Sequence, residues 1–411
     1  MDDHLGIDFV RRVLSPLRGR KSRQEEESGD SEPERARRCH RPRDFSPTPN
    51  ARAIRELESP SLRRSEVNRR QEFERAFPGG FFLDGDDLDG LERFLRDRGW
   101  LSAGESLRSV AAPGEGNMNL VLRAVTSSRS FILKQARPWV EKYPTIGAPA
   151  GRAEVEIAFY EAVSSRPPLR ERMPRLLGHD RSSGLVVLED LGAARDFTSL
   201  YRGGRLGESD LSDLVSYLAE LHHPFDTDSA ARRLFTNRDM RALNHEHIFR
   251  LPLVRDNGLE LDRITPGLGD AAASLKDDTS YVGAVRRLGS SYLEDGPALV
   301  HGDYFPGSWL RTESGIRVID PEFCFLGTAA FDVGVMLAHL HLSRQPIALG
   351  EALLSSYRER AGVGEPFVEL SRRFAGCEIM RRLIGVAQLP LSADLEEKAR
   401  LLAVSRDLVL C

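Results

Sequence analysis

The chain has 411 residues and a net charge of −4, with 40% hydrophobic and 29% charged residues. These values are typical of a globular protein with room for two lobes. They provide no excess of positive charge for nucleic acid or an anionic membrane, so neither is expected as a partner. No apolar run approaches the roughly 20 residues that span a bilayer. The cysteines fit no disulfide framework or metal site, which suits a reducing cytoplasm; they are Cys39, Cys324, Cys377 and Cys411.

Residues 1–75 differ in composition from the rest of the chain. They are dense in charges of both signs, Pro and Ser, and contain few aliphatic residues. Such a segment buries too little apolar surface to offset its ordering entropy, so we expect a disordered charged tail.

Residues 81–191 are predicted to form a small lobe with a mixed β-sheet. A helix is expected over Asp87–Arg98, with its cap at Asp86 or Asp87 and one apolar face. A second helix is expected over Arg152–Val163. Strands are expected at Leu107–Val110, Leu120–Val125, Phe131–Lys134 and Gly184–Leu188, with a hairpin turn at the sequence TSSRS.

Residues 192–411 are predicted to form a large, mainly helical lobe. The first helix, Asp210–His222, should be capped by Ser209, with His222 and His223 acting only as charges at its C-terminus. Further helices are expected at Asp270–Leu293, Ala330–Leu342, Ile347–Ala361, Phe367–Ala387 and Ala393–Leu408. A small mixed lobe followed by a helical lobe is an α+β two-lobe architecture.

Two short apolar runs at the start of the large lobe each end in acidic residues. Ala298–Val300 precedes His301-Gly302-Asp303, and Ile316–Ile319 precedes Asp320-Pro321-Glu322. Ionised carboxylates are rarely buried without a partner or a metal, so these acids are poor core-filling residues. The pattern predicts a phosphoryl-transfer site. Asp303 would orient the attacking hydroxyl group of a small-molecule acceptor, while Asp320, Glu322 and Ser308 would hold Mg²⁺.

Two upstream features would hold the nucleotide phosphates. The turn Gly114–Asn119 offers Gly114, Gly116, Asn117 and Asn119, whose backbone and amide groups suit phosphate oxygens, although such a turn alone is weak evidence. Lys134 ends the next strand, where kinase-like folds place a phosphate-binding lysine. Its carboxylate partner would be Glu154 or Glu156, which point about 200° apart around a helix. We prefer Glu156.

Two later features have simpler structural explanations when taken alone. Asp332 lies near the start of a helix, where a role in bonding backbone groups of the Asp303 loop is more common than direct catalysis. The adjacent Arg381 and Arg382 would ordinarily be solvent-facing charges on an amphipathic helix.

Taken in order, these motifs resemble the aminoglycoside phosphotransferase and choline kinase superfamily, and within it the methylthioribose kinase family. The resemblance spans about Phe81 to Val404. It rests on the segments GEGNMNLVLRA, FILKQARPWVEKYP, HGDYFPGSW, VIDPEFCFLGTAAFDVG and EIMRRLIGVA.

The resemblance implies a protein-kinase-like two-lobe fold and an ATP- and Mg²⁺-dependent kinase of methionine salvage. Its acceptor would be the anomeric hydroxyl of 5-methylthioribose. Adenine would bind the backbone between Glu189 and Leu191, and Arg381 and Arg382 would contact the sugar. A homodimer is also compatible with the resemblance.

Two departures from the family pattern affect the acceptor. Tyr304-Phe305-Pro306 replaces the usual Leu-His-Thr, with Ser308 in place of Asn, and Arg195–Thr265 matches only loosely. An aminoglycoside, a choline-like alcohol or another sugar therefore stays open as the acceptor, as does a non-catalytic nucleotide-binding module. A protein kinase is disfavoured because the D-F-G and A-P-E landmarks are absent from the sequence.

Overall fold

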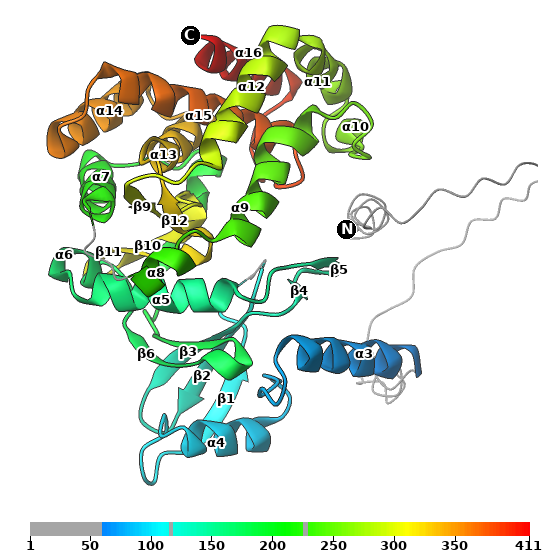
Figure 1. Ribbon diagram of the computed structural model, residues 1–411, viewed down its shortest axis with the longest axis vertical. Helices are drawn as coiled ribbons and strands as arrows, with labels where there is room; N and C mark the ends of the chain where they lie inside the picture. The colour runs from blue at the N-terminus through cyan, green and yellow to red at the C-terminus, as the bar shows by residue number, and fades with distance from the viewer. Residues whose placement is uncertain (1–59, 115–117, 225–228) are drawn as a thin grey trace, which may run out of the picture.

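The computed structural model describes residues 60–114, 118–224 and 229–411. A small lobe built on a β-sheet adjoins a larger helical lobe, with helix α5 (Arg152–Ser164) lying between them (Figure 1). The five strands of the small-lobe sheet are antiparallel and follow the order β1-β2-β3-β7-β6. Their bounds are β1 Leu107–Ala111, β2 Leu120–Thr126, β3 Ser130–Gln135, β6 Leu176–Asp180 and β7 Leu185–Glu189.

Alternation along the strands gives this sheet two different faces. Leu133 on β3 and Val187 on β7 join the small-lobe core beneath α4 (Leu88–Asp97), which begins at its predicted cap, Asp87. Because neighbouring side chains on a strand point to opposite faces, Lys134 lies on the other face of the sheet, the one that α5 covers. Val186 on β7 shares that second face and packs with residues of α5.

Helix α3 (Pro60–Ala76) corrects the predicted extent of the tail. We expected disorder through residue 75, but Phe73 is 1% exposed and its ring meets Phe82 edge-on at a centroid distance of 5.2 Å. The guanidinium group of Arg137 covers the same two rings. Phe73 therefore anchors this mostly polar helix to the small lobe. The rest of the predicted tail, residues 1–59, lies outside the described residues.

The large lobe is built around two central helices, α13 (Ala330–Leu342) and α15 (Glu365–Ile384), which are buried along most of their lengths. Other helices surround them (Figure 1). These are α7 Glu208–His222, α8 Ser229–Leu234, α9 Arg238–His245, α10 Leu261–Ile264, α11 Leu268–Asp277, α12 Thr279–Tyr292, α14 Ile347–Ala361 and α16 Leu395–Leu410. The short helix α6 (Pro167–Arg170) instead follows α5 and contacts α5 and α7.

Two predicted helices of this lobe differ in detail from the structure. Helix α7 has Gly207 at its N-cap rather than Ser209. The segment predicted as one helix over Asp270–Leu293 forms α11 and α12, because the side chain of Asp278 accepts a hydrogen bond from the Tyr281 amide and so begins a new helix.

Short strands position the acidic residues of the large lobe. Strand β9 (Ala298–Val300) pairs with β12 (Phe325–Gly327), whereas β11 (Gly315–Val318) pairs with β10 (Trp309–Thr312), which also pairs with β8 (Arg195–Asp196). A further hairpin, β4 (Trp139–Val140) with β5 (Tyr143–Gly147), projects from the small lobe. Within the described ranges, no helix is both long and apolar enough to cross a membrane.

Candidate active site

Lys134 joins the two lobes at the candidate site. Its Nζ atom lies 2.9 Å from Glu156 Oε1 on α5 and 2.9 Å from Asp320 Oδ1, which follows β11 in the large lobe. Glu154, the alternative partner, is exposed. The structure therefore pairs Lys134 with Glu156, the partner we preferred.

Burial and the neighbouring charges set the pKa values of Lys134 and Glu156 in this cluster. Burial opposes the charged form of Lys134, but the Asp320 and Glu156 carboxylates outweigh it and raise its pKa well above the usual value. Burial raises the pKa of Glu156 to about 7 against the opposing effect of Lys134, and the nearby Glu322 and Asp320 carboxylates add to the rise. Three carboxylates thus lie near two cationic groups, Lys134 and the Arg152 guanidinium beside Glu322, and this excess of negative charge favours a further cation.

Glu322 connects the second acidic turn to the glycine turn of the small lobe. Its Oε2 atom accepts a hydrogen bond from Asn119 Nδ2 at 2.8 Å and lies 3.2 Å from Arg152 Nε. Arg152 also donates to Asn119 Oδ1 at 3.0 Å. All three side chains are buried. Arg152 was not among the predicted site residues, although it is the first residue of the same helix that carries Glu156.

The remaining residues of the glycine turn are only partly described. A Cβ atom at Gly114 would meet no atom within 4 Å, so the backbone there is open to a close-fitting group. Gly116 and Asn117 lie outside the described residues. Their predicted contact with phosphates stays a prediction.

Asp332 holds the loop that carries Asp303. Its Oδ2 and Oδ1 atoms accept hydrogen bonds from the amides of His301 and Gly302, at 2.6 and 3.0 Å. This agrees with the bracing role predicted for it. Gly302 has φ +84°, and a Cβ there would lie 2.1 Å from the Phe323 carbonyl oxygen, so glycine is required at this position.

His222 is a second support for this loop, and our interpretation of it was wrong. We expected a charge at a helix end, but the His222 ring is buried and its Nε2 atom lies 3.1 Å from Asp332 Oδ2. Its Nδ1 atom lies 2.8 Å from the Tyr357 hydroxyl. A histidine at the end of an amphipathic helix is compatible with either role, because the local sequence does not show what covers the helix.

The Asp303 carboxylate lies against the arginine pair. Its Oδ1 atom is 3.1 Å from Arg382 Nη2 and 3.8 Å from Arg381 Nη2, and its side chain remains 22% exposed. Both arginines are buried, so the solvent-facing alternative for them is excluded. Ser308 Oγ donates to the Asp303 carbonyl oxygen at 3.0 Å, which stabilises the loop from within.

A sequence model described as the phosphotransferase enzyme family matches residues 109–368. The chain belongs to this family. It is accordingly a phosphotransferase with a protein-kinase-like fold that uses a hydroxyl group as acceptor.

Two curated relatives named methylthioribose kinase cover most of the chain. The protein from Exiguobacterium sibiricum is 29% identical over 331 residues, which are 69% of this chain and 80% of that protein. The protein from a Geobacillus species is 25% identical over 336 residues, or 71% and 82% respectively.

The matching solved structures are more distant in sequence. The choline kinase LicA from Streptococcus pneumoniae is 14% identical with a TM-score of 0.44, covering 78% of this chain and 98% of that one. An ADP-bound aminoglycoside phosphotransferase, also 14% identical, has a TM-score of 0.45 and covers 80% and 100%.

Glu378 is a buried carboxylate of the phosphotransferase that the sequence analysis missed. It lies 2.6 Å from Arg382 Nε and 3.2 Å from Arg381 Nη1. Burial opposes its ionisation, but the two guanidinium groups outweigh burial and hold the Glu378 pKa well below its usual range. The signal was present, because Glu378 precedes the arginines by three and four residues, the spacing at which helical side chains meet.

The Glu378 cluster extends to a buried histidine. His339 Nε2 lies 3.3 Å from Glu378 Oε1, and His339 Nδ1 lies 2.7 Å from the Tyr201 hydroxyl. Burial lowers the pKa of His339 to about 4, with the charge of Arg382 adding to the effect. A chain of polar contacts therefore runs from Tyr201 through His339, Glu378 and Arg382 to Asp303.

The backbone expected to bind adenine joins the two lobes at the end of β7. Glu189 is the last residue of that strand, and its side chain pairs with Arg175 Nε at 3.3 Å. Leu191 follows two residues later and is partly buried. The prediction concerns the backbone of these residues and stays a prediction.

Asp320 and Glu322 are suited to Mg²⁺ by their chemistry. Asp320 adopts φ 63° and ψ 55°, a strained conformation for a residue other than glycine, and its side chain is half exposed. Within the described ranges, no three His, Cys, Asp or Glu side chains are grouped to hold a metal. Kinase Mg²⁺ needs only one or two carboxylates, because substrate phosphates and water supply the other ligands.

Proposed function

We propose that the phosphotransferase uses ATP and Mg²⁺ to phosphorylate a hydroxyl of a small sugar, with 5-methylthioribose as the favoured acceptor. The observation that carries this proposal is the contact between Asp303 and two buried arginines. An acceptor bound there meets two guanidinium groups beside one carboxylate. Because Glu378 and Asp303 together balance the two arginines, the cluster has no excess of negative charge to attract the cationic groups of choline and aminoglycosides, while its guanidinium N–H groups suit the hydroxyl groups of a neutral polyol.

The small lobe would bind the nucleotide. In this proposal Lys134, held by Glu156, contacts the phosphates together with the glycine turn at Gly114 and Asn119. The backbone at Glu189 and Leu191 binds adenine. The Lys134–Asp320 contact supports this arrangement, because it brings the phosphate-binding lysine and the metal-binding turn within 2.9 Å of each other.

The large lobe would supply the metal-binding and acceptor groups. Asp320 and Glu322, with Ser308 nearby, would hold Mg²⁺, which neutralises charge on the phosphates when bound. Asp303 would accept a hydrogen bond from the acceptor hydroxyl and orient it toward the γ-phosphorus. Arg381 and Arg382 would bind other hydroxyl groups of the sugar. Positioning and charge neutralisation account for most catalysis in this reaction class.

The proposal is tested by measuring Mg·ATP consumption with 5-methylthioribose, ribose, choline and an aminoglycoside, with ³¹P NMR to identify the product. We expect turnover with 5-methylthioribose and little or none with the two cationic acceptors. Efficient phosphorylation of choline or an aminoglycoside, without turnover of 5-methylthioribose, would refute the acceptor and leave the reaction class in place.

A further inference from the structure

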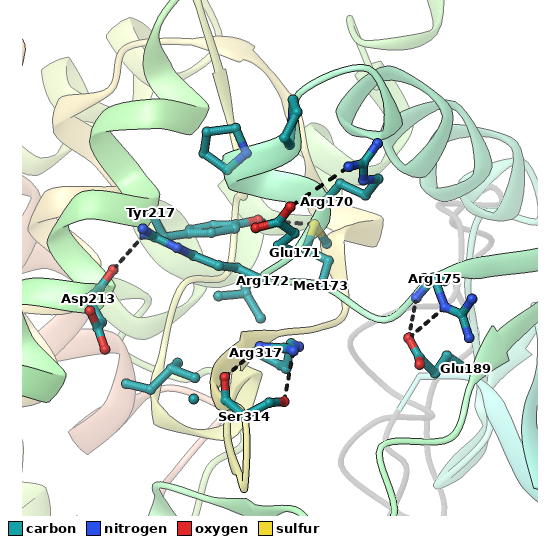
Figure 2. Close-up of a pocket in the computed structure, with 15 residues that line it drawn as sticks. Arg170, Glu171, Arg172, Met173, Arg175, Glu189, Asp213, Tyr217, Ser314 and Arg317 are labelled. Atoms are coloured by element: carbon teal, nitrogen blue, oxygen red, sulfur yellow. Dashed lines mark hydrogen bonds and ion pairs between the residues drawn. The ribbon is translucent and has the colours of Figure 1, made fainter.

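A cavity of 790 Å³ lies where α6, the segment before β6, α7 and the β10–β11 turn meet (Figure 2). This volume is in the range of pockets that hold small molecules. Arg170 lines it from the end of α6, Arg172 and Arg175 line it from the segment between α6 and β6, and Tyr217 and Arg317 line it from the large lobe. Of the described residues proposed for nucleotide, metal or acceptor binding, only Glu189 borders this cavity, through the side chain that faces Arg175.

Two arginines of the cavity have no acidic partner among the residues that the structure describes. Arg172 Nη1 donates to the carbonyl oxygen of Asp213 at 3.2 Å, and Arg317 donates to the hydroxyl and carbonyl oxygens of Ser314 (Figure 2). A guanidinium group carries five N–H donors, so both keep donors and a full charge available. Both are partly buried, where a charge interacts more strongly than in open solvent.

The other two arginines that line the cavity each lie near a carboxylate. Arg175 pairs with Glu189, and Arg170 lies 3.8 Å from Glu171. The cavity therefore holds four arginines and three acids, with two of the arginines already opposed by carboxylates. The uncompensated positive charge is concentrated at Arg172 and Arg317.

The cavity walls contact both acidic turns of the catalytic site. The Arg172 carbonyl oxygen accepts a hydrogen bond at 2.8 Å from the amide of Val318, two residues before Asp320. The Tyr217 ring stacks on Tyr304, the residue after Asp303, with centroids 5.8 Å apart and planes at 2°. A molecule in the cavity would touch groups that support both turns.

We propose that this cavity is a second ligand site of the phosphotransferase, for a small molecule that carries a phosphate or carboxylate group. Arg172 and Arg317 bind the oxyanion through their planar donor forks. The occupied cavity also restrains the Asp303 loop through the stacked tyrosines. This site does not depend on the identity of the acceptor or on turnover, and it is tested by binding.

Isothermal titration calorimetry with pyrophosphate and, separately, citrate tests the proposal at constant ionic strength without magnesium. The proteins compared are wild type, Arg172→Gln/Arg317→Gln and the matched control Arg170→Gln/Arg175→Gln. Binding of either probe near Lys134 should be the same in all three proteins. A difference in affinity between the two double variants therefore reports binding in the cavity. We expect the first double variant to bind one probe about tenfold more weakly, and the control to stay within about threefold of wild type.

Equal affinity in all three proteins, or an equal loss in the control, would overturn the proposal. The probe whose binding is lost identifies the group as phosphate or carboxylate. Arg317→Gln alone keeps the test decisive if the double variant fails to fold, because the Arg317 side chain is only partly buried and hydrogen-bonds to Ser314 of its own hairpin. This single variant should weaken binding by itself. Hydrogen exchange of residues 301–305 tests the restraint. Slower exchange with the probe is expected in wild type only, and an unchanged rate would refute the coupling.

Discussion

Lys134 and Asp320 come from different lobes and meet at 2.9 Å between Nζ and Oδ1. Lys134 is also held by Glu156, whose side chain is buried on α5. The position of this one lysine therefore depends on the small-lobe sheet, on α5 and on the turn after β11. Nucleotide binding should be sensitive to any change that releases the lysine from Glu156.

Replacing Glu156 with glutamine removes the charge that orients Lys134 and should reduce kcat/KM for ATP on the order of tenfold to a hundredfold. Steady-state kinetics with varied ATP measures this effect. The matched control is Glu154→Gln on the same helix, which changes an exposed carboxylate and should leave kcat/KM unchanged. Equal kinetics in both variants would show that Glu156 does not position the lysine.

Removing the Asp332 carboxylate should destabilise the Asp303 loop. In Asp332→Ala the buried amides of His301 and Gly302 lose their acceptor, and the free energy of unfolding should fall by about 3 kcal/mol. Urea unfolding measures the change. The exposed Asp407→Ala on α16 should stay within about 0.5 kcal/mol of wild type. A comparable loss in both proteins would contradict the bracing role.

Glu378→Gln tests the buried support of the arginine pair. The variant leaves two buried guanidinium groups without their shared carboxylate, so we expect a loss of about 3 kcal/mol in unfolding free energy. Because Arg382 would turn further toward Asp303, KM for the acceptor should rise while KM for ATP changes little. Glu369→Gln, an exposed carboxylate on the same helix, is the control. A rise in both KM values would indicate general damage to the fold.

His339 should make stability depend on pH. Burial lowers its pKa to about 4 from an ordinary value of 6.5, so the unfolded chain binds the proton more readily between these values. The contribution of neutral His339 to the free energy of unfolding is fully present above pH 6.5 and is lost as the pH falls toward 4. Linkage gives a loss of about 2 kcal/mol between pH 7 and pH 5. The groups facing His339 are Glu378, Arg382 and Tyr201.

The measurement compares unfolding free energies of wild type and His339→Gln at pH 7 and pH 5. Glu156 titrates in the opposite sense, because its raised pKa makes the folded state bind protons more readily, but this contribution is common to both proteins. The difference between the two proteins should therefore shrink by about 2 kcal/mol at pH 5. A constant difference would show that His339 is not held neutral by the fold.

Local sequence patterns predicted the elements whose partners lie nearby. Helices α13 and α14 have the predicted bounds, and the TSSRS turn joins β2 and β3 as expected. The pairing of β9 with β12, and the strands β6 and β10, could not be predicted, because short strands are selected by distant partners rather than by their own sequence.

The same distinction between nearby and distant partners applies to the residues of the candidate site. Glu156 could be preferred from its spacing to Phe159 and Tyr160, which share the buried side of α5. His222 and Arg152 were missed because the partners that define their roles, Asp332 and Glu322, lie 110 and 170 residues further along the chain. Their sequence neighbours give no indication of those contacts.

The proposed reaction depends most on Asp303 as the group that orients the acceptor hydroxyl. The most direct measurement is single-turnover phosphorylation of 5-methylthioribose by wild type and Asp303→Asn at saturating Mg·ATP. The asparagine keeps the shape but loses the charge, so the rate should fall about a thousandfold while the Kd for ATP stays within about threefold. An Asp303→Asn protein that transfers phosphate to 5-methylthioribose at the wild-type rate would contradict the account.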